Sequence, residues 1–100
     1  MELIYQYMSK SIISNDKCCY VCGVTRTLHR HHIFFGNANR EQSERYGCWV
    51  WLCYAHHNGS NAGVHFNKKL DDRLKKIAQK KFEEHYANKD FRSVFGKNYL

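Results

Sequence analysis

Two pairs of cysteine and histidine residues have the spacing of metal ligands. Two residues separate Cys19 from Cys22, and two residues separate Cys53 from His56. Both members of such a pair can reach one ion from a tight turn or from the first turn of a helix, and three thiolates with one imidazole complete a closed tetrahedral zinc site. Sulfur ligands favour zinc over magnesium or calcium. The spacing therefore predicts a structural Zn²⁺ ion; the alternative is a disulfide, which is typical of secreted chains.

Four further histidines could form a second site, because the first ion does not need them as ligands. They are His31, His32, His57 and His65. Histidine is the commonest metal ligand, and its pKa suits a general base near neutral pH. Since His57 directly follows the zinc ligand His56, it should point away from that ion. One interpretation is a catalytic cation held by some of these histidines, with another as the base; the other is a set of ordinary polar surface residues.

Two predicted strands should position these histidines. Residues 28–32 and 48–52 are rich in β-favouring types and should pair with each other. Adjacent residues of a strand face opposite sides, so His31 and His32 cannot both face one site unless the strand ends or bulges there. The second strand carries two tryptophans on one face, which we expect to pack in the core rather than to stack on bases.

The segment between these strands is rich in turn-forming residues. Residues 34–47 contain asparagines and glycines, which predict a loop with at most one helical turn, at residues 43–46. Arg40 and Arg45 lie in this segment, and a guanidinium group binds phosphate oxygens with paired hydrogen bonds. We expect both arginines to contact nucleic acid, Arg40 above all because it is nearer to the histidine pair; the alternative is that they are solvated.

Residues 66–86 form the most strongly predicted helix, because apolar residues recur at spacings of three and four. The residues that follow the spacing of one face are Leu70, Leu74, Ile77, Ala78, Lys81, Phe82 and His85, of which we expect His85 to lie at the surface. Asn67 should cap the first turn, and Asp90 should cap a short last helix. Basic residues on the opposite surface could follow a phosphate backbone or could form a solvated helix face. The candidates for nucleic-acid binding are Lys68, Lys69, Arg73 and Lys76.

Composition limits the class of protein. The chain has 100 residues, of which 16 are basic and 9 acidic, and a formal net charge of +7. The length predicts one domain, and the charge favours a polyanionic partner: nucleic acid first and an acidic membrane surface second, with simple solubility as the alternative. The odd number of cysteines suits a reducing compartment. Since no apolar run approaches the roughly 18 residues of a membrane span and no signal peptide is recognisable, we expect a cytoplasmic protein.

The order of these motifs resembles that of the HNH nuclease family. The chain has CxxC, then HHI, then LCxxHH, then VH, which is the order found in the ββα-metal fold built on a treble-clef zinc knuckle. Residues 28–36, 63–67 and 95–100 also resemble small HNH proteins encoded by temperate phages and prophages. Each motif alone is unspecific, but the combination is specific and the resemblance extends over about residues 17–100.

The resemblance implies an α+β fold in a single domain, residues 1–100. It places an N-terminal extension at residues 1–17, the zinc knuckle and ββα-metal core at residues 18–66, and C-terminal helices at residues 67–100. It also implies a part in phage DNA metabolism inside a bacterial host cell, without membrane attachment. DNA would be the main partner, and a phage or host protein of recombination, replication or packaging a further one.

The resemblance also assigns roles to individual residues. It makes His31, His57 and His65 the ligands of a catalytic divalent cation, His32 the general base, and Arg40 the residue that neutralises the scissile phosphate. The implied reaction is hydrolysis of DNA phosphodiester bonds to 5′ phosphate and 3′ hydroxyl ends. Mn²⁺, Mg²⁺, Ni²⁺ and Zn²⁺ are all candidate cations, although a site made only of imidazoles suits Mg²⁺ poorly.

Two positions depart from the family pattern. The HNH asparagine, which holds the metal loop in shape through backbone hydrogen bonds, is replaced by Cys48, and Asn37 and Asn39 are candidates to substitute for it. Family members often have two late histidines four residues apart on one helix, whereas here a glycine-rich turn must return His65 to His57. Two interpretations without catalysis stay open: a zinc-stabilised nucleic-acid-binding module, and a module that binds a phage protein.

Overall fold

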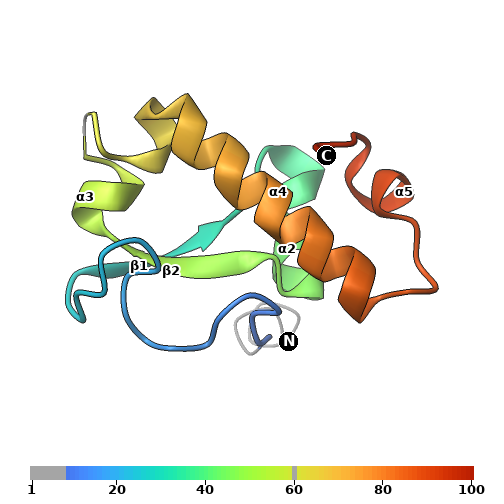
Figure 1. Cartoon of the computed structure of the whole chain (residues 1–100), viewed down its shortest axis with the longest axis horizontal. Coiled ribbons are helices and arrows are strands. Elements are labelled where there is room, and N and C mark those ends of the chain that lie inside the picture. The colour runs from blue at the N-terminus through green and yellow to red at the C-terminus, as the bar shows by residue number, and fades with distance from the viewer. Residues whose placement is uncertain (1–8, 60) are drawn as a thin grey trace.

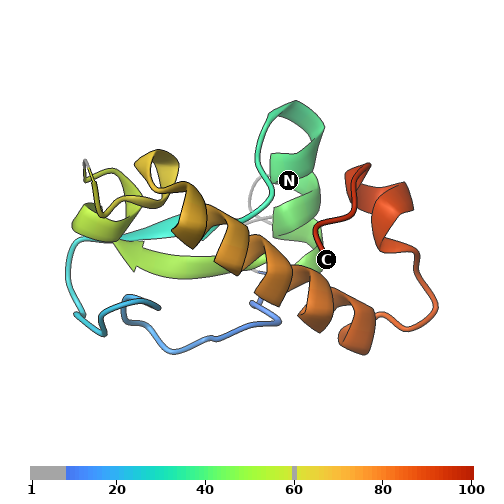
Figure 2. The ribbon, with the colours of Figure 1, turned by 45° about the horizontal axis from the view of Figure 1, so that its top comes forward.

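The fold is of the α+β class, as predicted, and is built on one pair of strands. The computed structural model describes residues 9–59 and 61–100. Its elements in chain order are β1 (Leu28–His32), α2 (Asn37–Tyr46), β2 (Trp49–Cys53), α3 (Tyr54–His57), the 3-10 helix η1 (Val64–Phe66), α4 (Lys68–His85) and α5 (Phe91–Phe95). Figures 1 and 2 show α4 running across the sheet, with α3 at one end of the molecule and α5 at the other.

β1 and β2 pair as an antiparallel sheet, which confirms the predicted pairing. His31 lies opposite Val50, and His32 lies opposite Trp49. Residues directly opposite each other share a face of the sheet, so His31 and His32 point to opposite sides. The two tryptophans of β2 share the His32 face, where their ring centroids are 5.3 Å apart, and Trp49 is buried as predicted.

β2 begins at Trp49, one residue later than predicted, and ends at Cys53. Cys48 nevertheless continues the pairing, because its carbonyl accepts a hydrogen bond from Ile33 N–H at 3.0 Å. The N–H of Cys48 donates to Ser43 O at 2.8 Å. The backbone of Cys48 therefore joins β2 both to the end of β1 and to α2.

α4 covers the sheet face opposite to the tryptophans. Its buried apolar residues Leu74, Ala78 and Phe82 pack in one core with Val50 and Leu52 of β2. Phe91 and Phe95 of α5 pack against the ring of Phe82, and Phe34, just after β1, packs against the same two rings and closes the far side of this core. α4 is amphipathic: its apolar side packs on the sheet, and its other side lies in solvent.

Polar Gln79 is also buried on α4, whereas Lys81, which follows the spacing of the inner face, is exposed; His85 is exposed as predicted. The Gln79 amide can be buried because it is hydrogen-bonded: its Nε2 donates to Asn98 Oδ1 at 2.7 Å, and its Oε1 accepts from Tyr99 N–H at 2.7 Å. The pattern of apolar residues could not indicate this, because the partners lie in the C-terminal segment.

Both predicted helix caps are confirmed. Asn67 Oδ1 accepts a hydrogen bond from Leu70 N–H at 3.1 Å, and α4 runs inside the predicted range 66–86. Asp90 Oδ2 accepts from Ser93 N–H at 3.1 Å at the start of α5. These caps satisfy N–H groups that the first turn of a helix leaves without partners.

α2 is much longer than the single turn predicted within residues 34–47. Its buried residues are polar, Ser43 and Glu44, so no apolar periodicity indicates the helix. Ser43 Oγ donates to Phe34 O at 2.6 Å and accepts from Phe34 N–H at 3.1 Å, which anchors the helix to the chain just after β1. The helix ends at Gly47, whose φ of 74° is the left-handed conformation that glycine adopts readily.

The sequence places an N-terminal extension at residues 1–17, before the zinc knuckle. Residues 9–17 form neither a helix nor a strand, and residues 1–8 lie outside the described part of the chain. Ser11 is buried and donates to Trp49 O at 2.6 Å, and Ile12 N–H donates to Gly47 O at 2.9 Å. Residues 9–17 are thus held by hydrogen bonds at the junction of α2 and β2, and Ile12 and Ile13 pack against the core. Among the helices of residues 9–59 and 61–100, none is long and apolar enough to cross a membrane.

Replacing Ser43 by alanine should lower the free energy of unfolding by about 1–3 kcal/mol, because both backbone groups of buried Phe34 lose their partner. Urea unfolding of the metal-loaded protein would measure the change. Ser93→Ala, which removes an exposed hydroxyl bonded to Asp90, is the control and should cost less than about 1 kcal/mol. Equal destabilisation by the two substitutions would contradict an anchoring role for Ser43.

Candidate functional site

The four predicted ligands of the first site converge. We call Cys19, Cys22, Cys53 and His56 the Cys₃His cluster; their ligand atoms all lie within 4.8 Å of one another. Cys22 Sγ is 3.8 Å from Cys53 Sγ, and His56 Nδ1 is 3.4 Å from Cys53 Sγ. Sulfur ligands about 2.3 Å from a tetrahedral ion are roughly 3.8 Å apart, so the cluster could hold a metal ion. All five cysteines are free, and 3.8 Å far exceeds the roughly 2.05 Å of a disulfide bond.

Backbone hydrogen bonds position the Cys₃His cluster beside the sheet. Gly23 N–H donates to Cys19 O at 2.8 Å and closes the first turn, where Gly23 has a left-handed φ of 83°. Tyr20 N–H donates to Trp51 O at 2.8 Å, which ties this turn to β2. α3 follows β2 without a gap, so its single turn returns His56 to the same point.

Cys19, which lies inside this cluster, and Cys48, which lies outside it, differ in acidity. Burial raises the pKa of the Cys19 thiol, but hydrogen bonds from backbone N–H groups outweigh burial and lower the pKa to about 6. The thiolate is the form that binds metals. Burial raises the pKa of Cys48, which lies outside the cluster, to about 12. The lowered pKa of Cys19 therefore favours the thiolate that binds a cation, whereas Cys48 is an unreactive core residue.

Three predicted ligands of the second site also converge. We call His31, His57 and His65 the histidine cluster; their ligand atoms lie within 4.8 Å of one another. Nε2 of His57 is 3.1 Å from Nε2 of His65, and the centroid of the His31 ring is 5.3 Å from those of the other two. The three residues come from β1, α3 and η1. The chain between α3 and η1 does return His65 to His57, as predicted.

The environment of the histidine cluster keeps its inner rings neutral. Burial, followed by the charges of neighbouring imidazoles and Lys75, lowers the pKa of His31 to about 3, and burial with neighbouring imidazoles lowers that of His57 to about 4. His31 is 2% exposed, and its Nε2 has no hydrogen-bond partner among residues 9–59 and 61–100. Such a nitrogen costs roughly 1–3 kcal/mol, and a cation would satisfy it. The histidine cluster could therefore hold a metal ion.

His29 is a further histidine at this site, which the sequence interpretation missed. Its Nδ1 is 3.0 Å from Nδ1 of His57, while the other ring nitrogen of His57 faces His65. His29 therefore holds the ring of His57 from the side opposite to the cluster, as hydrogen-bonded partners of ligating histidines do. The alternation of β1 indicates this position, because His29 and His31 share a face.

His32 lies on the other face of β1, against a buried carboxylate. Its Nε2 donates to Glu44 Oε1 at 2.7 Å. Burial lowers the pKa of His32; the hydrogen bond and charge of Glu44 oppose this, and the charges of Arg40 and Arg30 add to it. Glu44 was missed because it lies in the segment predicted as a loop. The structure therefore separates the predicted base from the histidine cluster by the thickness of the strand.

The two arginines of α2 have different surroundings. Both are exposed. The charge of Arg40 acts on the pKa of His32, so this guanidinium lies near the predicted base. Arg45 Nη2 is 3.9 Å from Glu41 Oε2, one turn earlier in the helix. Of the two, Arg40 is the one that the fold brings toward the candidate site.

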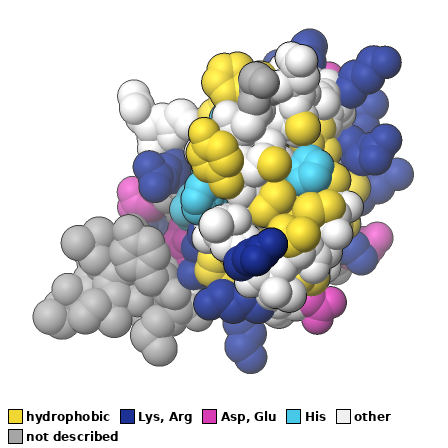
Figure 3. Space-filling model, turned by 90° about the vertical axis from the view of Figure 1, so that its left-hand side faces the viewer, with side chains coloured by type: hydrophobic (Ala, Val, Ile, Leu, Met, Phe, Trp, Pro, Cys, Tyr) yellow, Lys and Arg dark blue, Asp and Glu magenta, His cyan; other side chains and the backbone are white. Residues whose placement is uncertain are grey.

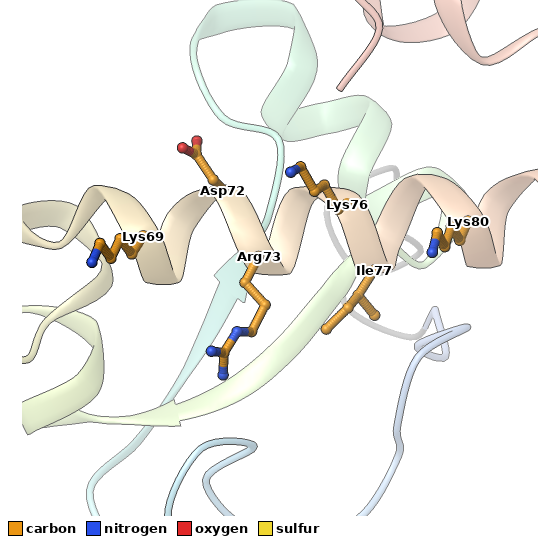
Figure 4. A pocket seen from close by; sticks show the side chains of 6 residues that line it. All are labelled: Lys69, Asp72, Arg73, Lys76, Ile77 and Lys80. Atoms are coloured by element: carbon orange, nitrogen blue, oxygen red, sulfur yellow. The ribbon is translucent and has the colours of Figure 1, made fainter. Parts of the chain in front are cut away.

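Basic residues of α4 border a shallow surface groove. Figure 4 shows the residues that line it: Lys69, Asp72, Arg73, Lys76, Ile77 and Lys80. A second hollow shares Lys69 and Arg73 and is also lined by His56 of the Cys₃His cluster. Lys68 instead pairs with Asp72 at 3.2 Å. Figure 3, which faces the α3 end, shows Lys and Arg side chains along one edge, beside hydrophobic side chains and a histidine. The groove therefore runs along α4 toward the Cys₃His cluster.

A comparison of the chain with protein-family models, with curated proteins and with solved structures finds no match.

Replacing Cys53 by alanine should weaken metal binding at the Cys₃His cluster by more than about 100-fold, because three ligands cannot complete a closed tetrahedral site. Titration with Co²⁺ would show this as the loss of thiolate-to-metal absorption. Cys48→Ala is the matched control, because it also removes a buried thiol near β2, and it should bind Co²⁺ like the wild type. Equal Co²⁺ binding by both variants would show that Cys53 is no ligand.

Proposed function

We propose that the protein is a metal-dependent endonuclease of the HNH type that hydrolyses DNA phosphodiester bonds. The proposal rests on the convergence of His31, His57 and His65, together with the position of His32 directly after His31 in the chain. His56 and His57 are consecutive residues of α3, so this helix supplies one ligand to each cluster. Two strands followed by a helix, with histidines from the first strand and the helix, suit the ββα-metal fold on a treble-clef knuckle.

In this proposal the Cys₃His cluster holds a structural Zn²⁺ ion. Three thiolates and one imidazole at tetrahedral spacing are the ligand set that zinc prefers in closed sites. The ion would join the turn at Cys19 to α3, and a domain of 100 residues gains stability from such a link.

The histidine cluster takes a catalytic divalent cation. When bound, the cation supplies positive charge that stabilises the leaving 3′ oxygen. His31 and His57 present lone pairs from neutral rings, and His65 completes the set from the exposed side. Mn²⁺, Ni²⁺ or Zn²⁺ suits three imidazoles better than Mg²⁺ does.

His32 acts as the general base. His32 directly follows His31 in β1, although its ring points to the other face of the strand. His32 takes one proton from water, the water oxygen bonds to phosphorus, and the 3′ oxygen leaves with the bonding electrons and is protonated by solvent. Arg40, near His32, neutralises the phosphate.

Ser43 supplies the backbone support that the family asparagine gives elsewhere. Cys48, at the asparagine position, has a buried thiol and offers no amide. Asn37 is exposed, and Asn39 Nδ2 donates to Phe95 O at 3.3 Å, so neither candidate replacement holds this loop. Ser43 bonds both backbone groups of the second residue after His32.

DNA would lie along the basic groove of α4. The groove residues Lys69, Arg73, Lys76 and Lys80 stand on one side of the helix, and the net charge of +7 favours a polyanion. Lys80 joins the candidates from the sequence, whereas Lys68 and Arg45 have acidic partners on their own helices.

Two rivals share part of this support. A zinc-stabilised nucleic-acid-binding module without catalysis needs only the Cys₃His cluster and the groove, and the replaced asparagine at Cys48 favours it. A module that binds a phage or host protein needs neither cleavage nor affinity for DNA that falls with salt.

Wild-type protein should nick or cut supercoiled plasmid or single-stranded DNA when titrated with Mn²⁺, Ni²⁺, Zn²⁺ or Mg²⁺, whereas His32→Ala should lose about 10²–10⁴-fold in rate. Gel electrophoresis of the products measures both. DNA affinity of the variant should stay within a few-fold of the wild type, since the groove is unchanged.

The control is His85→Ala, which removes an exposed histidine at the end of α4 and should cleave like the wild type. Absence of cleavage by zinc-loaded wild type with every cation would refute the endonuclease in favour of the binding module. Cleavage by His32→Ala at the wild-type rate would show that another group is the base.

The double variant Lys69→Ala/Arg73→Ala should reduce the salt dependence of duplex binding. Each lost phosphate contact lowers the slope of log affinity against log salt by about 0.9, so the pair should lower it by about 1.8. Fluorescence anisotropy over a range of NaCl concentrations gives the slope. Lys89→Ala/Lys97→Ala removes the same charge on either side of α5 and should leave the slope almost unchanged; an equal drop would mean that net charge alone binds DNA.

A further inference from the structure

The carboxylate of Glu44 is buried and has no role of its own in the proposed hydrolysis. Its side chain is 4% exposed, and both of its oxygens have partners. Oε1 accepts from His32 Nε2 at 2.7 Å, and Oε2 lies 3.1 Å from Arg30 Nη2 and accepts from Ser9 Oγ. Acidic side chains are almost never fully buried unless paired, so a carboxylate placed against the proposed base requires an explanation.

Arg30 is itself held in place, and it determines which oxygen is left for His32. Its guanidinium carbon is 3.8 Å from the centroid of the Trp49 ring, and its Nη2 donates to Ser9 O at 2.6 Å. A guanidinium is a planar set of donors with no acceptor. Because Arg30 occupies Oε2 of Glu44, Oε1 is directed at His32.

We propose that Glu44 is a positioning residue that holds the His32 ring in the tautomer with the proton on Nε2 and the lone pair on Nδ1. A carboxylate paired with Arg30 can only accept hydrogen bonds, so the ring nitrogen facing it carries the hydrogen. The hydrogen bond of one ring nitrogen decides the state of the other. Nδ1 is then the atom that takes the proton from water. The inference rests on the proposed endonuclease activity, and Glu44 itself does not touch DNA.

The fold supports this assignment through one helix. Glu44 directly follows Ser43, which bonds the backbone of Phe34. α2 therefore holds the chain after His32 through Ser43 and the His32 ring through Glu44.

The decisive variant is Glu44→Gln, which keeps the size of the side chain. Arg30 can only donate, so the amide oxygen should face Arg30 and the amide NH₂ should face His32. Nε2 must then accept, and the proton moves to Nδ1. We expect kcat to fall by about 10²–10⁴-fold with KM within about threefold of the wild type. The control is Glu84→Gln, an exposed change of the same charge on α4, which should leave both constants unchanged.

The tautomer itself can be measured without any cleavage. ¹⁵N NMR of the zinc-loaded wild type should show His32 protonated at Nε2 and unprotonated at Nδ1, and Glu44→Gln should exchange the two. A wild-type ring protonated at Nδ1 would overturn the inference even if the variant did not fold. A folded Glu44→Gln with the wild-type kcat would overturn it as well. If the wild type cleaves no DNA, the endonuclease is refuted, and Glu44 has no catalytic role. If the wild type is active, the tautomer and the kcat of Glu44→Gln test the role of Glu44 separately.

Discussion

The alternation of side chains along β1 is the constraint on which both histidine environments depend. Successive residues of a strand face opposite sides, so His29 and His31 reach α3 and η1 while Arg30 and His32 reach α2. The register with β2 fixes this division. A slip by one residue would bury Arg30 beneath α4 and send His31 toward the tryptophans, so both sites would be lost together.

Buried polar groups are stabilised differently on the two faces of the sheet. Beneath α4, burial and neighbouring rings hold His31 and His57 neutral, which leaves lone pairs that suit a cation. On the other face, Arg30 and His32 share the carboxylate of Glu44, and a buried charge is tolerated when it is paired and hydrogen-bonded. One strand thus places a neutral imidazole next in sequence to an imidazole that is hydrogen-bonded to a carboxylate.

α2 shows how a polar helix can be essential to a small domain. Isolated helices of ten residues are marginal in water, and this one buries Ser43 and Glu44 rather than an apolar stripe. Its position depends on hydrogen bonds to Phe34 and Cys48 and on the ion pair with Arg30. The helix is stable because it completes the polar contacts at the end of β1. Through the same contacts it holds the backbone of Phe34 and the ring of His32.

The sequence by itself determined the features that depend on short-range spacing. The pairs Cys19–Cys22 and Cys53–His56, the strand at residues 28–32 and the capped helix α4 all follow from residues that are near neighbours in the chain. Such features have a period or a fixed separation, and these are visible without tertiary structure.

Only the tertiary structure decided which partners the polar residues have. Glu44 against His32, His29 against His57 and Gln79 against the C-terminal segment join residues 12, 28 and 19 or 20 positions apart. A hydrogen bond between distant segments leaves no periodic trace in the sequence, because its cost of burial is offset at another place in the chain. That is why the two candidate metal clusters could be predicted from the sequence, whereas the hydrogen-bonded partners of the histidines could not.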